Sequence, residues 1–181
     1  MSAMITLPLD SDGWTIADLE RLPDDELRYE LVDGALLVTP PPPNAHNLVA
    51  NELGYLLRGV LSREWAVVAP GALELDIHNW RAPDLLVMRR EAVQRTYARP
   101  EEALLAVEVM SPSSVSTDRL VKPAQFAAAG IPHYWRIEPA EPLLITHVLA
   151  GDVYRETGRY TDEVVLAEPV PLAFRLADLM P

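Results

Sequence analysis

The sequence predicts an α/β domain, of the α+β kind, in which a mixed β-sheet is flanked by helices. Three observations support this fold class. The dipeptide Asp33-Gly34 separates two apolar runs, which is the signature of a two-residue hairpin turn. Apolar residues recur at helical spacing from about residue 45 to residue 63. Short apolar runs bounded by Pro and Gly fill much of the remaining chain, as strands do.

The N-terminal part of the domain is expected to contain a short helix followed by the hairpin. Thr15 can cap a helix within residues 14–22. The hairpin strands are predicted at Arg28–Val32 and Ala35–Thr39, because Asp-Gly tolerates the positive φ that both turn residues need. Four consecutive prolines, starting at Pro40, end the second strand.

The remaining elements follow from helical spacing and from turn residues. Asn44 can cap the helix of residues 45–63. A second helix is predicted over residues 117–129 and ends at Gly130, but Pro123 indicates that it begins only about one turn before the proline. We expect a strand pair near residues 66–69 and 72–77, further strands at 134–138, 143–149, 153–156 and 163–166, and a closing helical turn at 174–180.

Composition and charge limit the classes of protein to which the chain can belong. We expect a single domain over residues 14–181, with residues 1–13 as a loosely held start. No apolar run could span a bilayer, no signal peptide pattern is present and there is no cysteine, so we expect a cytoplasmic protein with no membrane partner. A net charge of -12 argues against a broad, sequence-independent grip on nucleic acid. A local basic rim remains open and could come from Arg81, Arg89, Arg90, Arg95 and Arg99, although such arginines are more often a solvated face.

Two acidic residues, Asp84 and Glu108, each lie in a short apolar run that reads as a strand. An ionised carboxylate in such a run is costly unless a positive charge lies beside it. Hard cations such as Mg²⁺ take oxygen ligands, so two carboxylates from neighbouring strands could share one ion, with the Val109 carbonyl as a further ligand. The alternative is that each carboxylate lies at a solvated edge of the sheet.

Three further polar residues each have two interpretations. In a helix, Asp118 and Lys122 lie one turn apart and can form an ordinary ion pair. Alternatively, Lys122 reaches back to the metal site and stabilises charge on a phosphate. His46 is either a helix cap or surface group, or a catalytic residue, and Glu30 is either an exposed cross-strand partner or a third acid that faces the metal.

Several motifs in this chain carry a family resemblance. In chain order they are Tyr29-Glu30-Leu31-Val32-Asp33-Gly34, His46, Pro83-Asp84-Leu85-Leu86-Val87, Val107-Glu108-Val109-Met110-Ser111-Pro112-Ser113, Asp118 with Lys122, and Ala129-Gly130-Ile131-Pro132-His133-Tyr134-Trp135. Together they resemble the Uma-two family of bacterial proteins, which belongs to the PD-(D/E)XK restriction-endonuclease-like superfamily. The match runs from about Trp14 to the C-terminus in the family's order and spacing.

The resemblance implies a restriction-endonuclease-like core of mixed β-strands flanked by helices, with an N-terminal β-hairpin and extra C-terminal strands. It also implies that Asp84 and Glu108 are the metal-binding pair and that Lys122 is the superfamily lysine. The superfamily pattern itself places the lysine two residues after the acid, where this chain has Met110. Lys122 matches the position on the following helix to which the family moves this residue.

The leading functional prediction is a nuclease that uses Mg²⁺ or Mn²⁺ to hydrolyse phosphodiester bonds in DNA. Asp84 and Glu108 would hold the ion, and Lys122 and Glu30 are further catalytic candidates. The alternative is a non-catalytic binding or regulatory module that retains this fold, which the charge of -12 favours. A third possible function is hydrolysis of a small phosphorylated molecule. We also expect a homodimer, because edge strands from the C-terminal half could pair across a two-fold axis.

Overall fold

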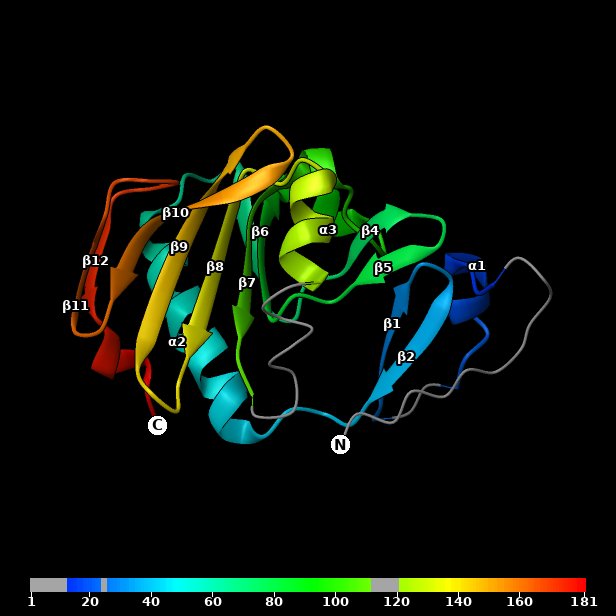
Figure 1. Ribbon diagram of the computed structural model, residues 1–181, viewed down its shortest axis with the longest axis horizontal. Coiled ribbons are helices and arrows are strands. Elements are labelled where there is room, and N and C mark those ends of the chain that lie inside the picture. Colours follow the sequence, from blue (N-terminus) through cyan, green and yellow to red (C-terminus); the bar gives the residue numbers. More distant parts are fainter. Residues whose placement is uncertain (1–12, 24–25, 112–120) are drawn as a thin grey trace.

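A six-stranded sheet dominates the computed structural model, which describes residues 13–23, 26–111 and 121–181 (Figure 1). Its strands lie in the order β10-β9-β8-β7-β6-β3. β7 and β8 are parallel, and the other neighbouring strands are antiparallel, so the sheet is mixed as predicted. The strands are β3 (Trp65–Val68), β6 (Leu85–Arg89), β7 (Ala103–Val109), β8 (His133–Glu138), β9 (Leu143–Ala150) and β10 (Val153–Tyr160).

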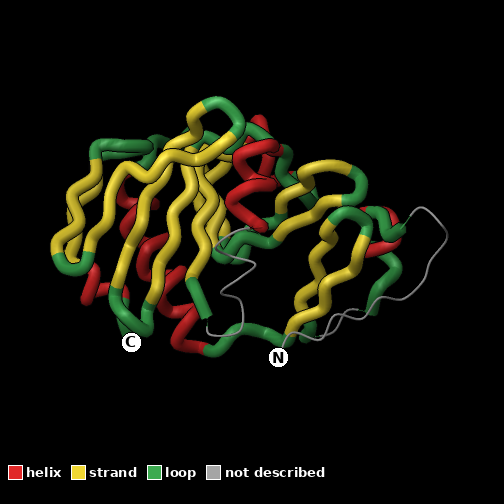
Figure 2. The backbone as a smooth tube through the Cα atoms, viewed as in Figure 1, coloured by secondary structure: helices red, strands yellow, loops and turns green. Residues whose placement is uncertain are grey.

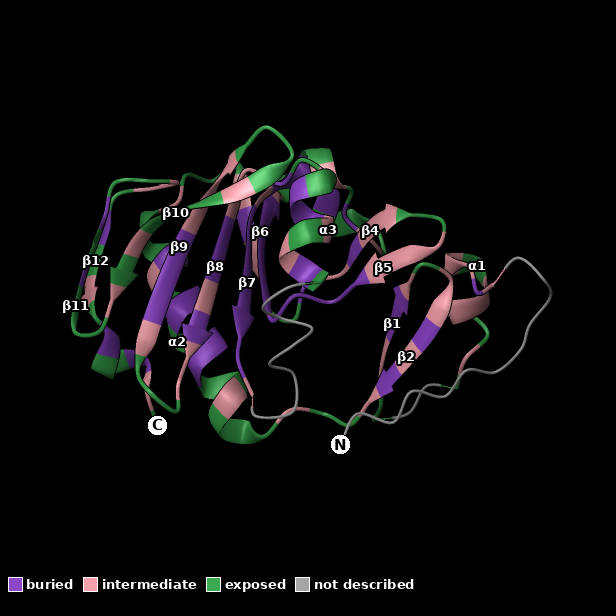
Figure 3. Cartoon of the chain, viewed as in Figure 1, coloured by how far each residue is buried: buried purple, intermediate pink, exposed green. Residues whose placement is uncertain are grey.

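Two helices cover the two faces of this sheet. Side chains alternate between the faces of a strand, so neighbouring residues of β6 belong to different cores. Leu85 lies in the buried cluster that includes the apolar face of α2 (Asn44–Val60). Leu86 lies in the cluster that includes Phe126 of α3 (Lys122–Ala128). The central strand β7 is buried along nearly its whole length, as Figure 3 shows.

A smaller four-stranded sheet, in the order β2-β1-β5-β4, contains the predicted hairpin (Figure 2). The hairpin strands β1 (Arg28–Val32) and β2 (Ala35–Thr39) have the predicted bounds, and Asp33 and Gly34 both have positive φ. Before the hairpin comes α1 (Ile16–Leu19), which Thr15 caps by donating its backbone N–H and its hydroxyl to the Asp18 carboxylate. The sheet is completed by β4 (Leu73–Asp76) and β5 (Asn79–Arg81).

The predicted pairing of residues 66–69 with residues 72–77 is wrong. β3 pairs with β6 in the large sheet, whereas β4 pairs with β5 in the small one. A tight turn after β4 explains the second pairing, because the Asp76 carboxylate accepts the backbone N–H of His78 and returns the chain at once. Gly71 lies between the two sheets, and its N–H donates to the Pro83 carbonyl at 2.8 Å.

The end of the second helix agrees with its prediction, whereas the C-terminal segment differs from the predicted helical turn. α3 is described from Lys122 and ends before Gly130, which has the expected positive φ. Residues 112–120, which include Asp118, lie outside the described part, as does most of the predicted N-terminal start. The extra C-terminal strands are β11 (Glu163–Leu166) and β12 (Leu172–Arg175), which pair with each other and precede a 3-10 helix, η4 (Leu176–Leu179). No helix in the described ranges is long and apolar enough to cross a membrane.

Candidate active site

Asp84 and Glu108 meet where β6 begins and β7 ends. The antiparallel register pairs Leu85 with Val107, and extending it by one residue sets Asp84 opposite Glu108 on the same face of the sheet. Asp84 is 6% exposed and Glu108 is 1% exposed. The alternative of two solvated edge carboxylates is therefore wrong, and both acids need positive or hydrogen-bonding partners inside the protein.

Asp84 receives those partners from three elements. Val109 donates its backbone N–H to Oδ2 at 2.8 Å, His46 Nε2 lies 3.1 Å from the same oxygen, and Arg28 Nη1 donates to Oδ1 at 3.1 Å. Burial by itself would raise the pKa of Asp84. The hydrogen bond from His46 and the charges of Lys122, His46 and Arg28 outweigh burial and hold this pKa well below its usual range. Asp84 is therefore ionised.

His46 enters the site from the first turn of α2. Its side chain is 10% exposed, so the surface interpretation is wrong. Nε2 lies 2.8 Å from the Val109 carbonyl as well as 3.1 Å from Asp84, and the ring therefore bridges β7 and the acid. Burial opposes protonation, but the hydrogen bond to Asp84 and its negative charge raise the pKa of His46. Asp84 thus favours the protonated form of His46.

Lys122 lies against Glu108. Its ammonium donates to Oε2 at 2.9 Å and lies 3.6 Å from the Glu30 carboxylate. Lys122 is only 6% exposed although it is the first residue of α3. Lys122 therefore lies at the acid pair, which agrees with the interpretation that its side chain reaches back to Asp84 and Glu108. The competing ion pair with Asp118 falls outside the described residues.

Glu30 connects the small sheet to the acid pair. It is 7% exposed, so the interpretation as an exposed cross-strand partner is wrong. Oε1 accepts the backbone N–H of Ala82 at 2.9 Å, and Oε2 lies 3.5 Å from Arg81 Nη1. Gln125 of α3 holds the other side of this guanidinium by accepting from Arg81 Nε at 2.7 Å. Glu30 thus fixes the segment that leads into Asp84.

The described part of this cluster holds as many acids as permanent cations. Its buried acids are Glu30, Asp84 and Glu108, and its permanent cations are Arg28, Arg81 and Lys122. His46 adds further positive charge when it is protonated. Any additional cation must therefore share the carboxylates with side chains that already neutralise them.

A cleft of about 340 Å³ opens beside the cluster. It is lined by Arg28, Pro42, Asn47, Ala50, Asn51, Ala69, Pro70 and Asp84. Arg28 and Asp84 thus belong both to the buried cluster and to the wall of this cleft. The cleft gives a ligand access to the Asp84 side of the site.

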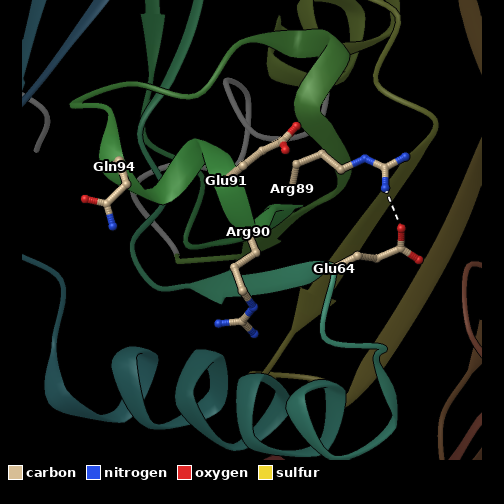
Figure 4. Close-up of a pocket in the computed structure, with 5 residues that line it drawn as sticks. All are labelled: Glu64, Arg89, Arg90, Glu91 and Gln94. Carbon is tan, nitrogen blue, oxygen red and sulfur yellow. Dashed lines mark hydrogen bonds and ion pairs between the residues drawn. The ribbon is translucent and has the colours of Figure 1, made fainter.

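Four of the five arginines considered for a basic rim have side-chain partners within the protein, namely Arg81, Arg89, Arg90 and Arg95. Arg81 is fully buried and cannot form part of a surface rim. At the far end of β6, Arg89 pairs with Glu64 at 2.7 Å (Figure 4). Arg89 also lies over the Trp65 ring, and Arg90 donates to the backbone carbonyl of Trp65. Glu64, Arg89 and Arg90 border a cleft of about 570 Å³ together with Glu91 and Gln94. Its two arginines already have partners within the protein.

The donor set fits a hard divalent cation. Mg²⁺ usually takes one or two carboxylates and keeps several waters, and Asp84 and Glu108 supply two buried carboxylates with the Val109 carbonyl beside them. Within the described residues, no three Asp, Glu or His side chains are arranged to hold an ion. Water would therefore have to complete the coordination shell.

Comparison with known proteins places the chain in a family. The family Uma2, described as "Putative restriction endonuclease", matches residues 16–178. The chain belongs to this family. The Uma2 match includes the segments that carry Glu30, Asp84, Glu108 and Lys122. No curated protein matches the chain.

A solved structure shares the fold of this Uma2 protein. It is described as a putative nuclease belonging to DUF820, from Anabaena variabilis, and it superposes with a TM-score of 0.71 over 91% of this chain and 96% of that chain. The two sequences are 19% identical, a level at which the likeness shows a common fold alone. The predicted α+β fold class is confirmed.

Two participants in the site were missed at the sequence level. Arg28 begins β1, and Gln125 lies in α3, and neither has a local sequence signal that marks it as a site residue. Arg28 and Asp84 are 56 residues apart, and Arg81 and Gln125 are 44 apart. Only the pairing of β1 with β5 and the docking of α3 bring these side chains to the acids.

Proposed function

We propose that this protein is a metal-dependent nuclease that hydrolyses phosphodiester bonds in DNA. The observation that carries the proposal is the ammonium of Lys122 held 2.9 Å from buried Glu108, with Asp84 opposite on the neighbouring strand. Carboxylates that hold a cation, next to a positioned ammonium, are what hydrolysis of a phosphodiester requires. Membership in the Uma2 family supports the nuclease class.

In the proposed mechanism, each residue of the cluster has a separate task. Asp84 and Glu108 would hold Mg²⁺ or Mn²⁺, and the ion would supply a water of lowered pKa and positive charge beside the phosphate. The Val109 N–H and His46 keep the Asp84 carboxylate in one orientation. Lys122 stabilises negative charge as it develops on the phosphate oxygens.

Glu30 acts in this proposal as a positioning residue. It lies 3.6 Å from the Lys122 ammonium and accepts the Ala82 N–H, so it restrains both the lysine and the segment before Asp84. Its carboxylate also partly neutralises Arg81. Glu30→Gln keeps an acceptor for Ala82 but removes the charge beside Lys122.

A nuclease assay tests the proposal directly. The purified protein is incubated with single-stranded and double-stranded DNA in Mg²⁺ or Mn²⁺, and with a small phosphodiester such as bis(p-nitrophenyl) phosphate. Glu108→Gln, purified in parallel, measures contaminating nuclease. We expect cleavage by the wild type that EDTA abolishes and that Glu108→Gln lacks.

The alternative, a non-catalytic module, has one observation in its favour. The chain carries a charge of -12, and Arg89 and Arg90 are engaged by their own surroundings. Equal, background-level cleavage by wild type and Glu108→Gln on every substrate would support the module and contradict the nuclease. Cleavage of the small phosphodiester without cleavage of DNA would instead support the third function, hydrolysis of a small phosphorylated molecule.

We also propose a homodimer located in the cytoplasm, where a DNA nuclease meets its substrate. β10 forms one edge of the six-stranded sheet, and only β9 pairs with it among the described strands. An eight-residue strand at an edge offers backbone groups to a second copy. Light scattering coupled to size-exclusion chromatography would give twice the chain mass of 20.1 kDa if the dimer forms, and a single-chain mass would contradict it.

A further inference from the structure

Arg28 belongs to both the acid cluster and the cleft beside it. Its Nη1 donates to Asp84 Oδ1 at 3.1 Å, and its Nη2 donates to the Ala82 carbonyl at 2.8 Å. The side chain is 23% exposed, whereas Asp84 is nearly buried. Arg28 therefore neutralises a candidate metal ligand while one part of it remains accessible from the cleft.

The described lining of the cleft offers hydrogen-bond donors to an anion. Among the described residues that line it, Arg28 is the one cation and Asp84 is the one acid. Asn47 and Asn51, one turn apart on α2, add neutral amide groups that can donate hydrogen bonds. Asp84 is the one described carboxylate that an anion would meet in this cleft, and it is the proposed ligand of a divalent cation.

We propose that Arg28 is a phosphate-binding residue that exchanges Asp84 for a phosphodiester of the substrate when Asp84 takes up the metal ion. The inference rests on the proposed function, because it assigns the substrate's phosphate to a residue of that same site. In the structure, Arg28 donates a hydrogen bond to Asp84 Oδ1, and this bond would break when Asp84 binds the metal ion. A guanidinium is suited to both partners, since its planar array of donors matches carboxylates and phosphates alike.

Charge balance provides the physical reason for such an exchange. Among the described residues, Arg28, Arg81 and Lys122 already neutralise the three buried acids, so a divalent cation would add positive charge to this cluster. Displacing Arg28 from Asp84 without a new partner would leave a largely buried cation unpaired, which is costly. A phosphodiester in the cleft supplies that partner. Metal and phosphodiester should therefore bind cooperatively, each strengthening the binding of the other by the same factor.

Mn²⁺ titration by calorimetry, with and without dimethyl phosphate, tests this exchange. Dimethyl phosphate is the simplest phosphodiester, and the measurement requires no cleavage. For the wild type, we expect saturating dimethyl phosphate to tighten Mn²⁺ binding by about fivefold or more. Arg28→Gln removes the competing charge, so it should bind Mn²⁺ alone at least roughly tenfold more tightly than the wild type. It should also gain less from dimethyl phosphate.

Matched variants separate the effect of charge from general disturbance of the fold. Arg28→Lys keeps the charge and should bind Mn²⁺ alone as the wild type does. Arg89→Gln removes an arginine that pairs with Glu64 at the other end of β6, outside the site, and should leave every Mn²⁺ measurement unchanged (Figure 4). Circular dichroism verifies that each variant is folded at the temperature of the titration.

The outcomes distinguish this inference from the proposed function. If Asp84→Asn loses Mn²⁺ binding but folded Arg28→Gln binds Mn²⁺ no more tightly than the wild type, the exchange is refuted and the metal site stands. The exchange is also refuted if dimethyl phosphate tightens Mn²⁺ binding equally in the wild type and in Arg28→Gln. It is refuted as well if Arg28→Lys and Arg28→Gln bind Mn²⁺ alone more tightly than the wild type by the same factor. If wild type and Asp84→Asn bind Mn²⁺ equally, the proposed metal site fails, and the exchange fails with it.

Discussion

The Lys122 ammonium and the Glu108 carboxylate form a buried ion pair between the first residue of α3 and the penultimate residue of β7. Neither side chain is more than 8% exposed, and their closest N and O atoms are 2.9 Å apart. A pair in this environment differs from an exposed pair on a helix, because breaking it leaves a charge inside the protein. It therefore links the stability of the fold to the proposed chemistry.

Lys122→Met should destabilise the metal-free protein by about 3 kcal/mol, because it leaves Glu108 without its ammonium in a buried position. The double variant Lys122→Met with Glu108→Gln should recover much of this loss, since it also removes the carboxylate that the Lys122 ammonium neutralised. Urea unfolding measures both changes. The control is Arg159→Met, which removes an exposed partner of Glu156 and should cost less than about 1 kcal/mol. A similar, small loss for Lys122→Met and Arg159→Met would show that the buried pair has no special weight.

Asp84→Asn should remove the stabilisation that Mn²⁺ provides, because an amide carries no charge to offset the cation. A ligand that binds only the folded state raises the melting temperature, so Mn²⁺ should raise that of the wild type and leave that of Asp84→Asn nearly unchanged. Differential scanning calorimetry with and without Mn²⁺ measures the shift. Glu64→Gln is the control, because Glu64 forms an exposed ion pair with Arg89 at the other end of β6. Mn²⁺ should raise its melting temperature only as much as it raises that of the wild type. An equal rise in Asp84→Asn would remove Asp84 from the metal site.

Gly71→Ala should destabilise the protein by about 1–3 kcal/mol, because the added Cβ would lie only 2.5 Å from Leu86 Cβ. Neither of these atoms can rotate away, so the backbone would have to shift beside Pro83 and Asp84. Gly59→Ala in α2 is the matched control, since its Cβ would meet no atom within 4 Å and alanine favours a helix by up to about 1 kcal/mol. Thermal melts should rank Gly59→Ala above Gly71→Ala. The reverse order would contradict the close approach at Gly71.

The wild type should lose stability as the pH falls from 7 to 5, in part through His147. Burial, assisted by Arg136 and Arg159, lowers the pKa of His147 below its value in the unfolded chain, about 6.5. The unfolded state therefore binds more protons in this range, and stability decreases as the pH falls; one pKa unit between the two states is worth about 1.4 kcal/mol. In urea unfolding at the two pH values, His147→Gln should show a smaller loss than the wild type. An equal loss would exclude His147 as a contributor.

Much of the secondary structure could be predicted from short stretches of the chain. The hairpin bounds were correct because Asp33 and Gly34 tolerate the positive φ of their turn whatever surrounds them. Gly130 ended α3 for the same kind of local reason. The strands of Asp84 and Glu108 were recognisable because apolar, strand-forming residues surround each acid.

The sequence by itself determined the turns at Asp33-Gly34 and Gly130, most of the segments that form strands or helices, and which acidic residues lie within apolar runs. Only the tertiary structure decided which segments pair, as β3 with β6 and β4 with β5 show. It alone placed Arg28 on Asp84 across 56 residues and Glu30 on the backbone of Ala82 across 52 residues. The physical reason is that turns and periodicity depend on neighbouring residues, whereas the neutralisation of a buried charge depends on side chains that strand order and helix docking bring from distant parts of the chain.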